Sequence, residues 1–104
     1  MIRNLSQLKK QINEGTSFEI IDHCRKECVG QIRKPNVIQS NGFYSIIPNE
    51  PDSRESKGSN GNGSWLEYGK ASYWTFDNGI CSVYLSGEHS QESFIMSFKL
   101  IEKE

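Results

Sequence analysis

The chain has 104 residues, a formal net charge of −1, 35% hydrophobic residues and 11% aromatic residues. This length suits a single domain over residues 1–104 with one modest core, and the aromatic share is too high for a disordered chain. The near-zero net charge provides no basic surface of the kind that duplex nucleic acid attracts, so duplex binding is not expected.

The sequence shows no sign of membrane contact or export. No apolar run approaches the roughly 20 residues that a membrane-spanning helix needs. The first residues, MIRNLSQLKKQINEG, lack the apolar centre of a signal peptide. Three cysteines, an odd number in a small chain, do not suggest a disulfide framework. We therefore expect a cytoplasmic protein.

The N-terminal segment predicts an amphipathic helix. Four apolar residues recur at spacings of three and four and so share one stripe: Ile2, Leu5, Leu8 and Ile12. Asn4 can cap the helix with Gln7 as its partner three residues on, and Gly15 can end it. We expect this helix to cover one side of a sheet.

After the helix the pattern becomes that of β-strands. TSFEIIDHC and CVGQIRK predict two strands, and Pro35 should lie at an edge or a bulge because it has no N–H to donate. In NVIQSNGFYSII and YWTFDNGICSVYL, the pairs Asn41-Gly42 and Asn78-Gly79 predict hairpins with type I′ turns. A last strand, SFIMSFKLI, turns alternate residues inward: Phe94, Met96, Phe98 and Leu100.

Residues 49–64 are rich in Asn, Ser and Gly and predict a flexible internal loop. The glycine-rich part of this loop lacks the G-x-x-x-x-G-K-[ST] pattern of a phosphate loop. Together the elements predict an α+β fold. We expect the N-terminal helix to pack on a twisted antiparallel β-sheet of five or six strands, which can curl toward a half-barrel.

The second Asn-Gly turn fixes a pairing register and therefore the two faces of its hairpin. One face is apolar and should be core: Trp74, Phe76, Cys81, Val83 and Leu85. The other face carries two tyrosines, two hydroxyl residues and a carboxylate: Tyr73, Tyr84, Thr75, Ser82 and Asp77. Adjacent tyrosines can stack on a planar ring and hydrogen-bond its edge, although such cross-strand pairs also stabilise sheets without a ligand. We take this aromatic platform as a candidate ligand site.

Basic residues concentrate in CRKECVGQIRK, close in sequence to Tyr44. Arg33 and Lys34 follow the predicted turn on the returning strand, where a guanidinium group would suit a phosphate. The alternative is a solvated edge strand whose charges prevent aggregation. On the first interpretation, Arg33, Lys34 and Tyr44 belong to the ligand site together with the platform.

The segment IIDHCRKECVG brings a histidine and two cysteines together. If it forms a hairpin around the loop 25–27, Cys24 and Cys28 face each other, as a disulfide under oxidation or as two thiols in a reducing cytoplasm. Zinc is not expected, because His23 would point to the opposite face and a CxxxC pair is a weak signal. We predict a tight basic turn, no metal or other cofactor, and no enzymatic activity.

Two stretches, GQIRKPNVIQSNGFY and WLEYGKASYWTFDNGICSVY, carry a resemblance. Over most of its length the chain resembles small uncharacterised proteins of Firmicutes prophages and mobile elements. No activity or site residue is known for that group, so none carries over. The resemblance implies a host bacterial cytoplasm and a non-enzymatic, accessory or counter-defence role.

Two functions of different class follow as expectations. The first is a non-catalytic phage binding protein that sequesters a small nucleotide-like immune signal on the aromatic platform. The alternative is an anti-CRISPR-like protein–protein inhibitor that binds a host defence protein through a sheet face or edge. A third, structural or transcription-linked role stays open. An exposed edge beside Pro35 could also support a homodimer.

Overall fold

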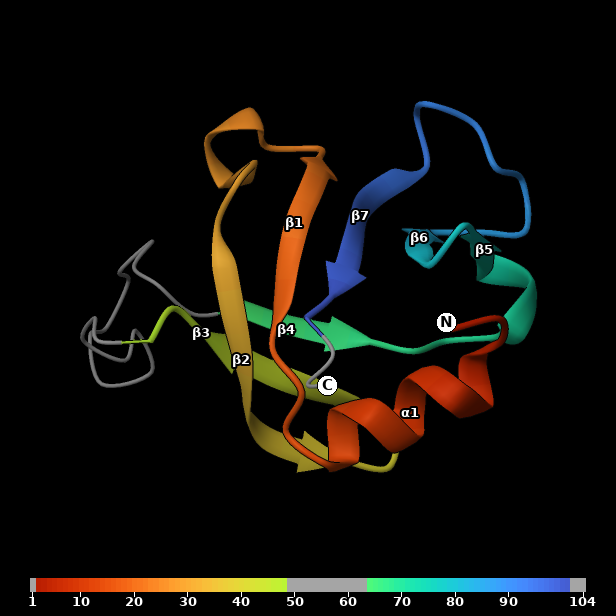
Figure 1. The fold of residues 1–104 in the computed structure, drawn as a ribbon. Coiled ribbons are helices and arrows are strands. Elements are labelled where there is room, and N and C mark those ends of the chain that lie inside the picture. The colour runs from red at the N-terminus through yellow and green to blue at the C-terminus, as the bar shows by residue number, and fades with distance from the viewer. Residues whose placement is uncertain (1, 49–63, 102–104) are drawn as a thin grey trace.

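The computed structural model of the chain describes residues 2–48 and 64–101 (Figure 1). One α-helix and seven strands form within these residues: α1 (Leu5–Asn13), β1 (Phe18–His23), β2 (Ile32–Gln39), β3 (Gly42–Ile46), β4 (Ser64–Glu67), β5 (Trp74–Asp77), β6 (Ile80–Tyr84) and β7 (Phe94–Leu100). Two short 3₁₀ helices, η1 (Lys26–Cys28) and η3 (Ala71–Tyr73), lie in connections. Most of the predicted flexible loop, residues 49–63, lies outside the described residues. None of the described helices is long and apolar enough to cross a membrane.

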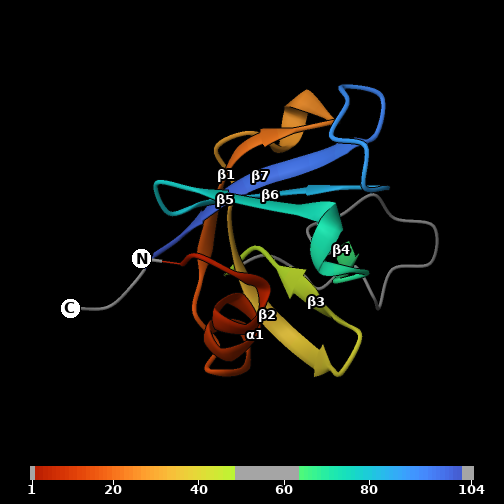
Figure 2. The ribbon, with the colours of Figure 1, turned by 90° about the vertical axis from the view of Figure 1, so that its right-hand side faces the viewer.

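All seven strands join one antiparallel sheet in the order β4-β3-β2-β1-β7-β6-β5. The sheet is open, with β4 and β5 at its two edges. It bends along β2, so that β3 and β4 run across behind β1 (Figure 1), and a turned view shows the two halves as separate layers (Figure 2). The predicted α+β class and antiparallel sheet are confirmed, with seven strands in place of five or six.

The strand that the sequence did not predict is β4. Its sequence, SWLE, is short and follows a long polar run, so its alternation is too brief to identify a strand. Pairing with β3 defines it, because Gly42 lies opposite Glu67 and Phe43 opposite Leu66. A long-range contact, and not a local pattern, therefore makes this segment a strand.

The helix α1 forms as its pattern predicts. Asn4 Oδ1 accepts a hydrogen bond from the backbone N–H of Gln7 at 2.9 Å. The Gln7 side chain reaches one residue further back than in a capping box and accepts from the N–H of Arg3 at 2.8 Å. Gly15 follows the helix with a φ of +82°, and its N–H donates to the carbonyl of Ile12 at 2.9 Å.

The core lies between the two halves of the sheet and α1. Its largest fully buried side chains come from α1, β1, β3, β6 and β7: Phe18, Phe43, Phe98, Leu8, Ile12, Ile20, Val83 and Cys81. The ring of Phe18 lies 4.8 Å from that of Phe98 and meets Phe43 edge-on at 5.9 Å, which joins the two halves. Burying each of the large apolar side chains is worth about 1.5–3 kcal/mol.

The second hairpin has the predicted register. Asp77 pairs with Ile80, and the pairing continues to Trp74 opposite Val83. The turn residues Asn78-Gly79 have φ values of +52° and +79°, as a type I′ turn requires. The core face of β5 and β6 is therefore confirmed up to Trp74 and Val83.

Two residues at the open end of this hairpin depart from the prediction. Leu85 is 68% exposed, because β6 ends at Tyr84 and the chain turns away into the connection to β7. Tyr73 belongs to η3, which precedes β5, and it packs against the core. It does not lie opposite Tyr84, so the predicted pair of outward tyrosines is wrong.

The first hairpin forms where predicted, but its turn is displaced by one residue. Gln39 pairs with Gly42, which leaves Ser40 and Asn41 as the loop, and neither loop residue has a positive φ. Gly42 is required by packing instead, because a Cβ at this position would collide with the carbonyl oxygen of Leu66 in β4. The predicted type I′ turn at Asn41-Gly42 is therefore wrong.

Pro35 lies at a bulge, which is one of the two positions predicted for it. The register between β2 and β3 shifts between Pro35 and Val37. The other predicted position, a sheet edge, is wrong, because β2 lies between β3 and β1. The described pairs join β2 to β1 only through Ile32 and Arg33, so no pairing with β1 requires an N–H from Pro35.

The predicted tight hairpin around the two cysteines does not form. Residues 24–31 make a longer connection that contains η1, and the nearest strand pair is Glu19 with Ile32. Cys24 is exposed whereas Cys28 is buried, and both are free thiols. The two cysteines therefore do not flank a strand pair.

Candidate functional site

An open pocket of about 460 Å³ lies where β1 and β6 end, beside the connection from β6 to β7. We call it the Tyr84 pocket. Aromatic rings form one wall: Tyr84, His89 and Phe94. Polar side chains line its rim: Asp22, His23 and Lys26. A few polar groups beside a ring-lined wall, in a volume of a few hundred cubic ångströms, are typical of small-molecule sites.

The strand register leads a row of polar residues into this pocket. Four such residues are cross-strand neighbours on β1, β7, β6 and β5, in that order: Asp22, Ser97, Ser82 and Thr75. Cross-strand neighbours share a face, and this face is opposite to the buried Cys81. Ser82 Oγ and Ser97 Oγ lie 2.7 Å apart and form a hydrogen bond. Two predicted site residues, Thr75 and Ser82, thus lie on the face that carries the pocket.

Tyr84 follows Ser82 on the same face and carries the aromatic wall. His89 stacks on the Tyr84 ring with 4.7 Å between centroids and 22° between planes, and Phe94 meets this ring edge-on at 5.6 Å. His89 Nε2 lies 2.7 Å from the carbonyl oxygen of Ser72, which can only accept, so Nε2 carries the hydrogen. This bond holds the connection from β6 to β7 against η3.

His23 presents a hydrogen-bond donor at the rim. Its Nδ1 accepts from the backbone N–H of Arg25 at 2.9 Å, so the hydrogen of the neutral ring is on Nε2. Burial lowers the pKa of His23, and the positive charges of Arg25 and Arg33 lower it further. The neutral ring therefore predominates at pH 7. No hydrogen bond among the described residues uses Nε2. In the register of β1 with β7, His23 lies opposite the buried Met96, whereas Asp22 lies opposite Ser97.

Asp22 presents an acceptor beside it. The pKa of Asp22 is lowered chiefly by its hydrogen bond from Lys26 Nζ, and also by one from the His23 N–H; both are 2.8 Å long. The carboxylate is therefore ionised at pH 7. Both bonds end on Oδ1, and no bond within the described residues uses Oδ2. The Asp22 carboxylate thus offers an acceptor on the face that also carries Ser97.

The thiol of Cys24 also lines the pocket, with its Sγ 3.7 Å from His23 Nδ1. That nitrogen already accepts the Arg25 N–H. The described residues contain no group of three or more His, Cys, Asp or Glu side chains that could hold a metal ion.

The predicted basic residues are not brought to the Tyr84 pocket. Arg33 is 5% exposed, and its Nε and Nη2 donate to Gln31 Oε1 at 3.1 and 2.7 Å. Burial lowers the pKa of Arg33, while the neighbouring Cys28 and, to a smaller extent, the half-buried Tyr44 raise it. Lys34 is exposed and lines a different hollow. The predicted site is thus split: Thr75, Ser82 and Tyr84 come together, whereas the other four residues do not join them.

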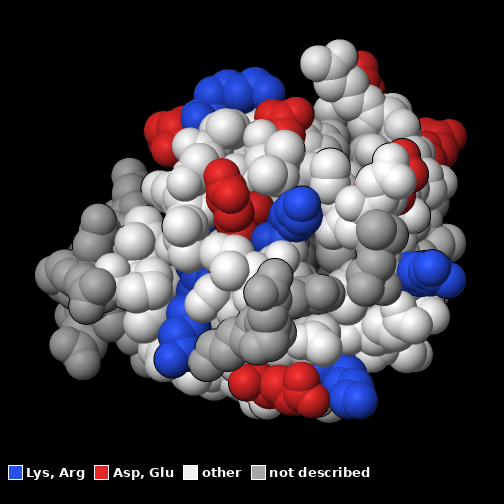
Figure 3. Space-filling model, viewed as in Figure 1, with Lys and Arg blue, Asp and Glu red and all other residues white. Residues whose placement is uncertain are grey.

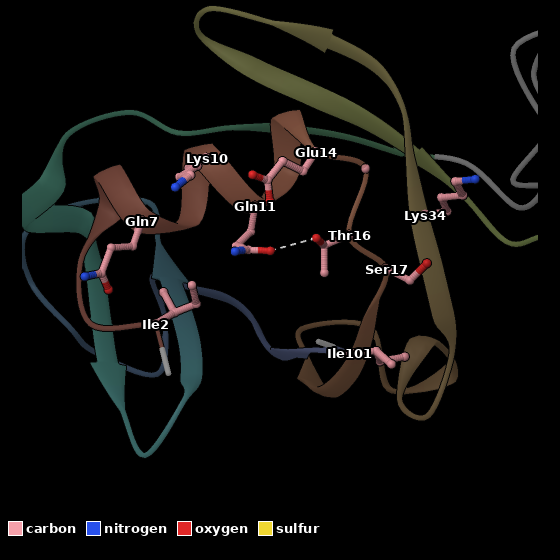
Figure 4. Close-up of a pocket in the computed structure, with 10 residues that line it drawn as sticks. Ile2, Gln7, Lys10, Gln11, Glu14, Thr16, Ser17, Lys34 and Ile101 are labelled. Carbon is pink, nitrogen blue, oxygen red and sulfur yellow. Dashed lines mark hydrogen bonds between the residues drawn. The ribbon is translucent and has the colours of Figure 1, made fainter. Parts of the chain in front are cut away.

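That second hollow, of about 720 Å³, lies between α1, residues 15–17 and the end of β7 (Figure 4). Its described lining includes no aromatic ring, histidine or cysteine. The Thr16 hydroxyl donates to Gln11 Oε1 at 2.8 Å, and Lys34 extends away from both (Figure 4). The hollow is larger but offers fewer groups that could recognise a ligand, so we take the Tyr84 pocket as the candidate site.

Of the residues that line the pocket, only Tyr84 was predicted as a site residue; Asp22, His23 and His89 are among those that were not. The neighbours Asp22-His23 stand out as a pair of polar groups at a strand end. Only the pairing of β1 with β7, which sets Asp22 opposite Ser97, brings that pair near Tyr84. This pairing joins segments far apart in the chain and has no local signal.

Comparison of the chain with protein-family models, with curated proteins and with solved structures gives no significant match. The resemblance to proteins of Firmicutes prophages therefore stays a prediction. The function has to be inferred from the Tyr84 pocket and the surface around it.

Proposed function

We propose that the protein is a non-catalytic binding protein that sequesters a small nucleotide-like ligand in the Tyr84 pocket. The observation that carries the proposal is the ring wall of Tyr84 and His89 in the same pocket as the Asp22 carboxylate, whose Oδ2 is used by no bond within the described residues. A planar ring can stack on such a wall while the carboxylate accepts a hydrogen bond from another part of the ligand.

Lys26 supplies a positive charge at the rim. Its side chain is 78% exposed, and its pairing with Asp22 at the surface is weak enough for the ammonium group to turn toward a ligand phosphate. The face seen in Figure 3 shows basic side chains scattered among acidic ones, without a single basic patch. One cation at the rim suits a small phosphate-bearing ligand better than the backbone of a duplex.

Binding without catalysis is supported by how the pocket's reactive groups are engaged. The imidazole nitrogen nearest to Cys24 Sγ accepts the Arg25 N–H and is not poised as a base for the thiol. The biological role that we propose, counter-defence through removal of an immune signal, rests on the resemblance to prophage and mobile-element proteins.

Calorimetry tests the proposal directly. The protein is titrated with the four ribonucleoside monophosphates and with cyclic dinucleotides, as wild type and as Tyr84→Ala. We expect saturable heat with at least one nucleotide and a loss of about ten-fold in affinity or more for Tyr84→Ala, since stacking contributes about 1–3 kcal/mol per base.

Thr75→Ala is the matched control, because it lies on the same face two strands away from β7 and outside the pocket lining. It should keep the wild-type affinity, and thermal unfolding should show that both variants are folded. The proposal is abandoned if no nucleotide produces heat, or if Tyr84→Ala binds as tightly as the wild type.

A second candidate, a protein–protein inhibitor, is favoured by exposed apolar side chains around the β1–β2 connection. Ile21, Val29 and Ile32 are 41%, 44% and 47% exposed. The Ile20 N–H donates to the carbonyl of Gln31 at 2.9 Å, which holds the two segments side by side. Apolar side chains gathered on a surface mark many protein contact sites.

Affinity capture from a bacterial lysate distinguishes the two candidates. An inhibitor should retain a stoichiometric protein partner, lose it on Ile32→Asp and keep it on Tyr84→Ala. A sequestering protein should instead release a small molecule on heating, and Tyr84→Ala should abolish that release while Ile32→Asp leaves it unchanged.

A further inference from the structure

We infer that the Tyr84 pocket recognises the sugar of its ligand, and specifically two adjacent hydroxyls such as those of ribose, through Asp22 and Ser97. This inference rests on the proposed function and deepens it. It names the part of the nucleotide that the polar side of the pocket selects, and it predicts a preference for ribonucleotides over forms that lack the diol.

Asp22 and Ser97 lie side by side on the face of the sheet that carries the pocket. They are direct cross-strand partners in the pairing of β1 with β7, and both line the Tyr84 pocket. The Cβ atoms of such partners are about 4.5–5.5 Å apart, and their side chains share one face. The strand register therefore sets a carboxylate and a hydroxyl next to each other, at a spacing that two adjacent hydroxyls of one sugar can bridge.

Contacts within the protein orient the carboxylate of Asp22. The Lys26 ammonium and the His23 backbone N–H both donate to Oδ1 at 2.8 Å, and no bond within the described residues uses Oδ2. An ionised carboxylate can only accept, so Oδ2 requires a donor from the ligand. A hydroxyl that donates to a carboxylate forms a short hydrogen bond that is about twice as strong as one between neutral groups.

Ser97 can bind a hydroxyl in either direction. Its Oγ lies 2.7 Å from Ser82 Oγ, and either hydroxyl can be the donor of that bond. If Ser82 donates, Ser97 keeps its hydrogen for a ligand oxygen; if Ser97 donates, it keeps a lone pair for a ligand hydrogen. A sugar hydroxyl satisfies both cases, because it donates and accepts. A diol thus supplies a donor for Asp22 and an adaptable partner for Ser97.

The ring wall lies where the base of such a ligand would be. Ser82 is the cross-strand partner of Ser97. Tyr84 is two residues beyond Ser82 on β6, which is about 7 Å along the strand. In a ribonucleoside the base is attached to the sugar carbon next to the diol, so a sugar held at Ser97 leaves its base within reach of the Tyr84 ring. The polar residues and the ring wall therefore fit the two halves of one nucleoside.

The test is a comparison of dissociation constants by calorimetry. Each of the four ribonucleoside monophosphates is paired with its 2′,3′-dideoxy form and titrated into wild type, Asp22→Ala and the double variant Asp22→Ala/Ser97→Ala. For a nucleotide that binds the wild type, we expect loss of the diol to weaken binding by about ten-fold or more, because a hydrogen bond to a charged group is lost. Asp22→Ala should reduce this ratio, and in the double variant the two forms should bind within about two-fold of each other.

Asp77→Ala is the matched control, because it removes an exposed carboxylate from the edge strand β5, outside the pocket lining. It should keep the wild-type ratio, and thermal unfolding should show that all variants are folded. An equal loss of the ratio in Asp77→Ala would mean that the charge of the sheet face, and not contact with Asp22, causes the preference, which overturns the inference.

Three further outcomes separate this inference from the proposed function. If the wild type binds both forms equally, or if the double variant keeps the full preference, the inference is overturned while the proposed function stands. The same holds if only cyclic dinucleotides bind, because their 3′ hydroxyls are esterified and no diol remains. If no nucleotide binds the wild type, the proposed function itself fails.

Discussion

The two hairpins that contain an Asn-Gly pair use the same dipeptide in different ways. At Asn78-Gly79 both residues adopt a positive φ and form the turn themselves. At Asn41-Gly42 the loop is Ser40-Asn41, and the glycine already belongs to β3. The dipeptide marks a hairpin in both places, but the surroundings of the glycine decide what it does.

The difference lies in what packs beside each turn. Gly42 has β4 against it, and the Leu66 carbonyl oxygen occupies the space that a Cβ would need. In the second hairpin, β5 is an edge strand and pairs with β6 alone. The backbone of the turn therefore sets the register of this pair. That register matters for the candidate site, because it turns Ser82 and Tyr84 to the side of the pocket.

The largest effect is expected from Gly42→Ala. The new methyl group would press on the backbone of β4 and on the Trp65 side chain, whose nearest atom would lie 2.9 Å away. Overpacking against backbone that cannot move should cost about 3 kcal/mol or more, measured by denaturant unfolding. Gly87→Ala is the control, because its Cβ would meet nothing closer than Ser72 Oγ at 3.8 Å. Equal stability of the two variants would show that β4 does not determine the role of Gly42.

A smaller loss is expected from Gly79→Ala. The φ of Gly79 is +79°, and an L-residue with a Cβ is strained in this region by about 1–2 kcal/mol. Chemical denaturation at pH 7 measures the loss. Gly79→Asn should lose less, because asparagine tolerates positive φ better than alanine does. A loss for Gly79→Ala as large as that for Gly42→Ala would contradict the distinction between strain and collision.

Asn78→Ala should lower the free energy of unfolding by about 1 kcal/mol or less. The loss arises because asparagine adopts a positive φ more readily than alanine does. The φ of Asn78 is +52°. Asn78→Gly should be neutral or slightly stabilising in the same unfolding experiment. If glycine is worse than alanine at this position, the Asn78 side chain makes a contact that matters more than its backbone conformation.

Asn41→Ala should change stability by no more than about 0.5 kcal/mol. Its φ is not positive, and its described hydrogen bond is made by the backbone carbonyl, which accepts from the Tyr68 N–H at 2.9 Å. Thermal unfolding of Asn41→Ala beside Asn78→Ala gives the direct contrast between the two corners. A larger loss at Asn41 than at Asn78 would reverse the comparison.

The last expected effect is a loss of stability that is smallest at neutral pH and grows in alkaline solution. Burial raises the pKa of Cys81 in β6 and of Tyr68 after β4 to about 12. The unfolded chain loses these protons near the ordinary pKa values, 9.0 and 10.0, whereas the folded chain keeps them. The stability that they contribute is therefore complete below about pH 9 and is lost as the pH rises toward 12.

Urea unfolding between about pH 8 and pH 12 measures this loss. Tyr68→Phe should flatten the curve above about pH 10, and Cys81→Ala should flatten the part that begins near pH 9. A midpoint that is independent of pH in the wild type would show that neither group is held neutral by the fold.

Local sequence signals predicted the parts of the fold that depend on local chemistry. The cap at Asn4, the stop at Gly15 and the turn at Asn78-Gly79 each follow from the properties of one or two residues. The alternation in β5 and β6 predicted the buried side of that hairpin as far as the strands extend. It failed at Tyr73 and Leu85, because strand ends are set by contacts and not by the pattern itself.

The candidate site could be predicted only in part for the same reason. Tyr84 and Ser82 are placed by a local turn and were identified. Asp22 and His23 reach the pocket through the pairing of β1 with β7, and His89 through its bond to Ser72 in η3. These contacts join distant segments, and no spacing in the sequence indicates them.

Mapping of backbone amide chemical shifts by NMR, during titration with AMP, GMP and UMP, tests most directly whether the Tyr84 pocket binds a base. Binding there predicts that the shifts of a bound nucleotide concentrate at His23, Tyr84 and His89. Shifts that concentrate instead around Lys34 and Ile101, in the larger hollow, or no shift with any of the three nucleotides, would contradict it.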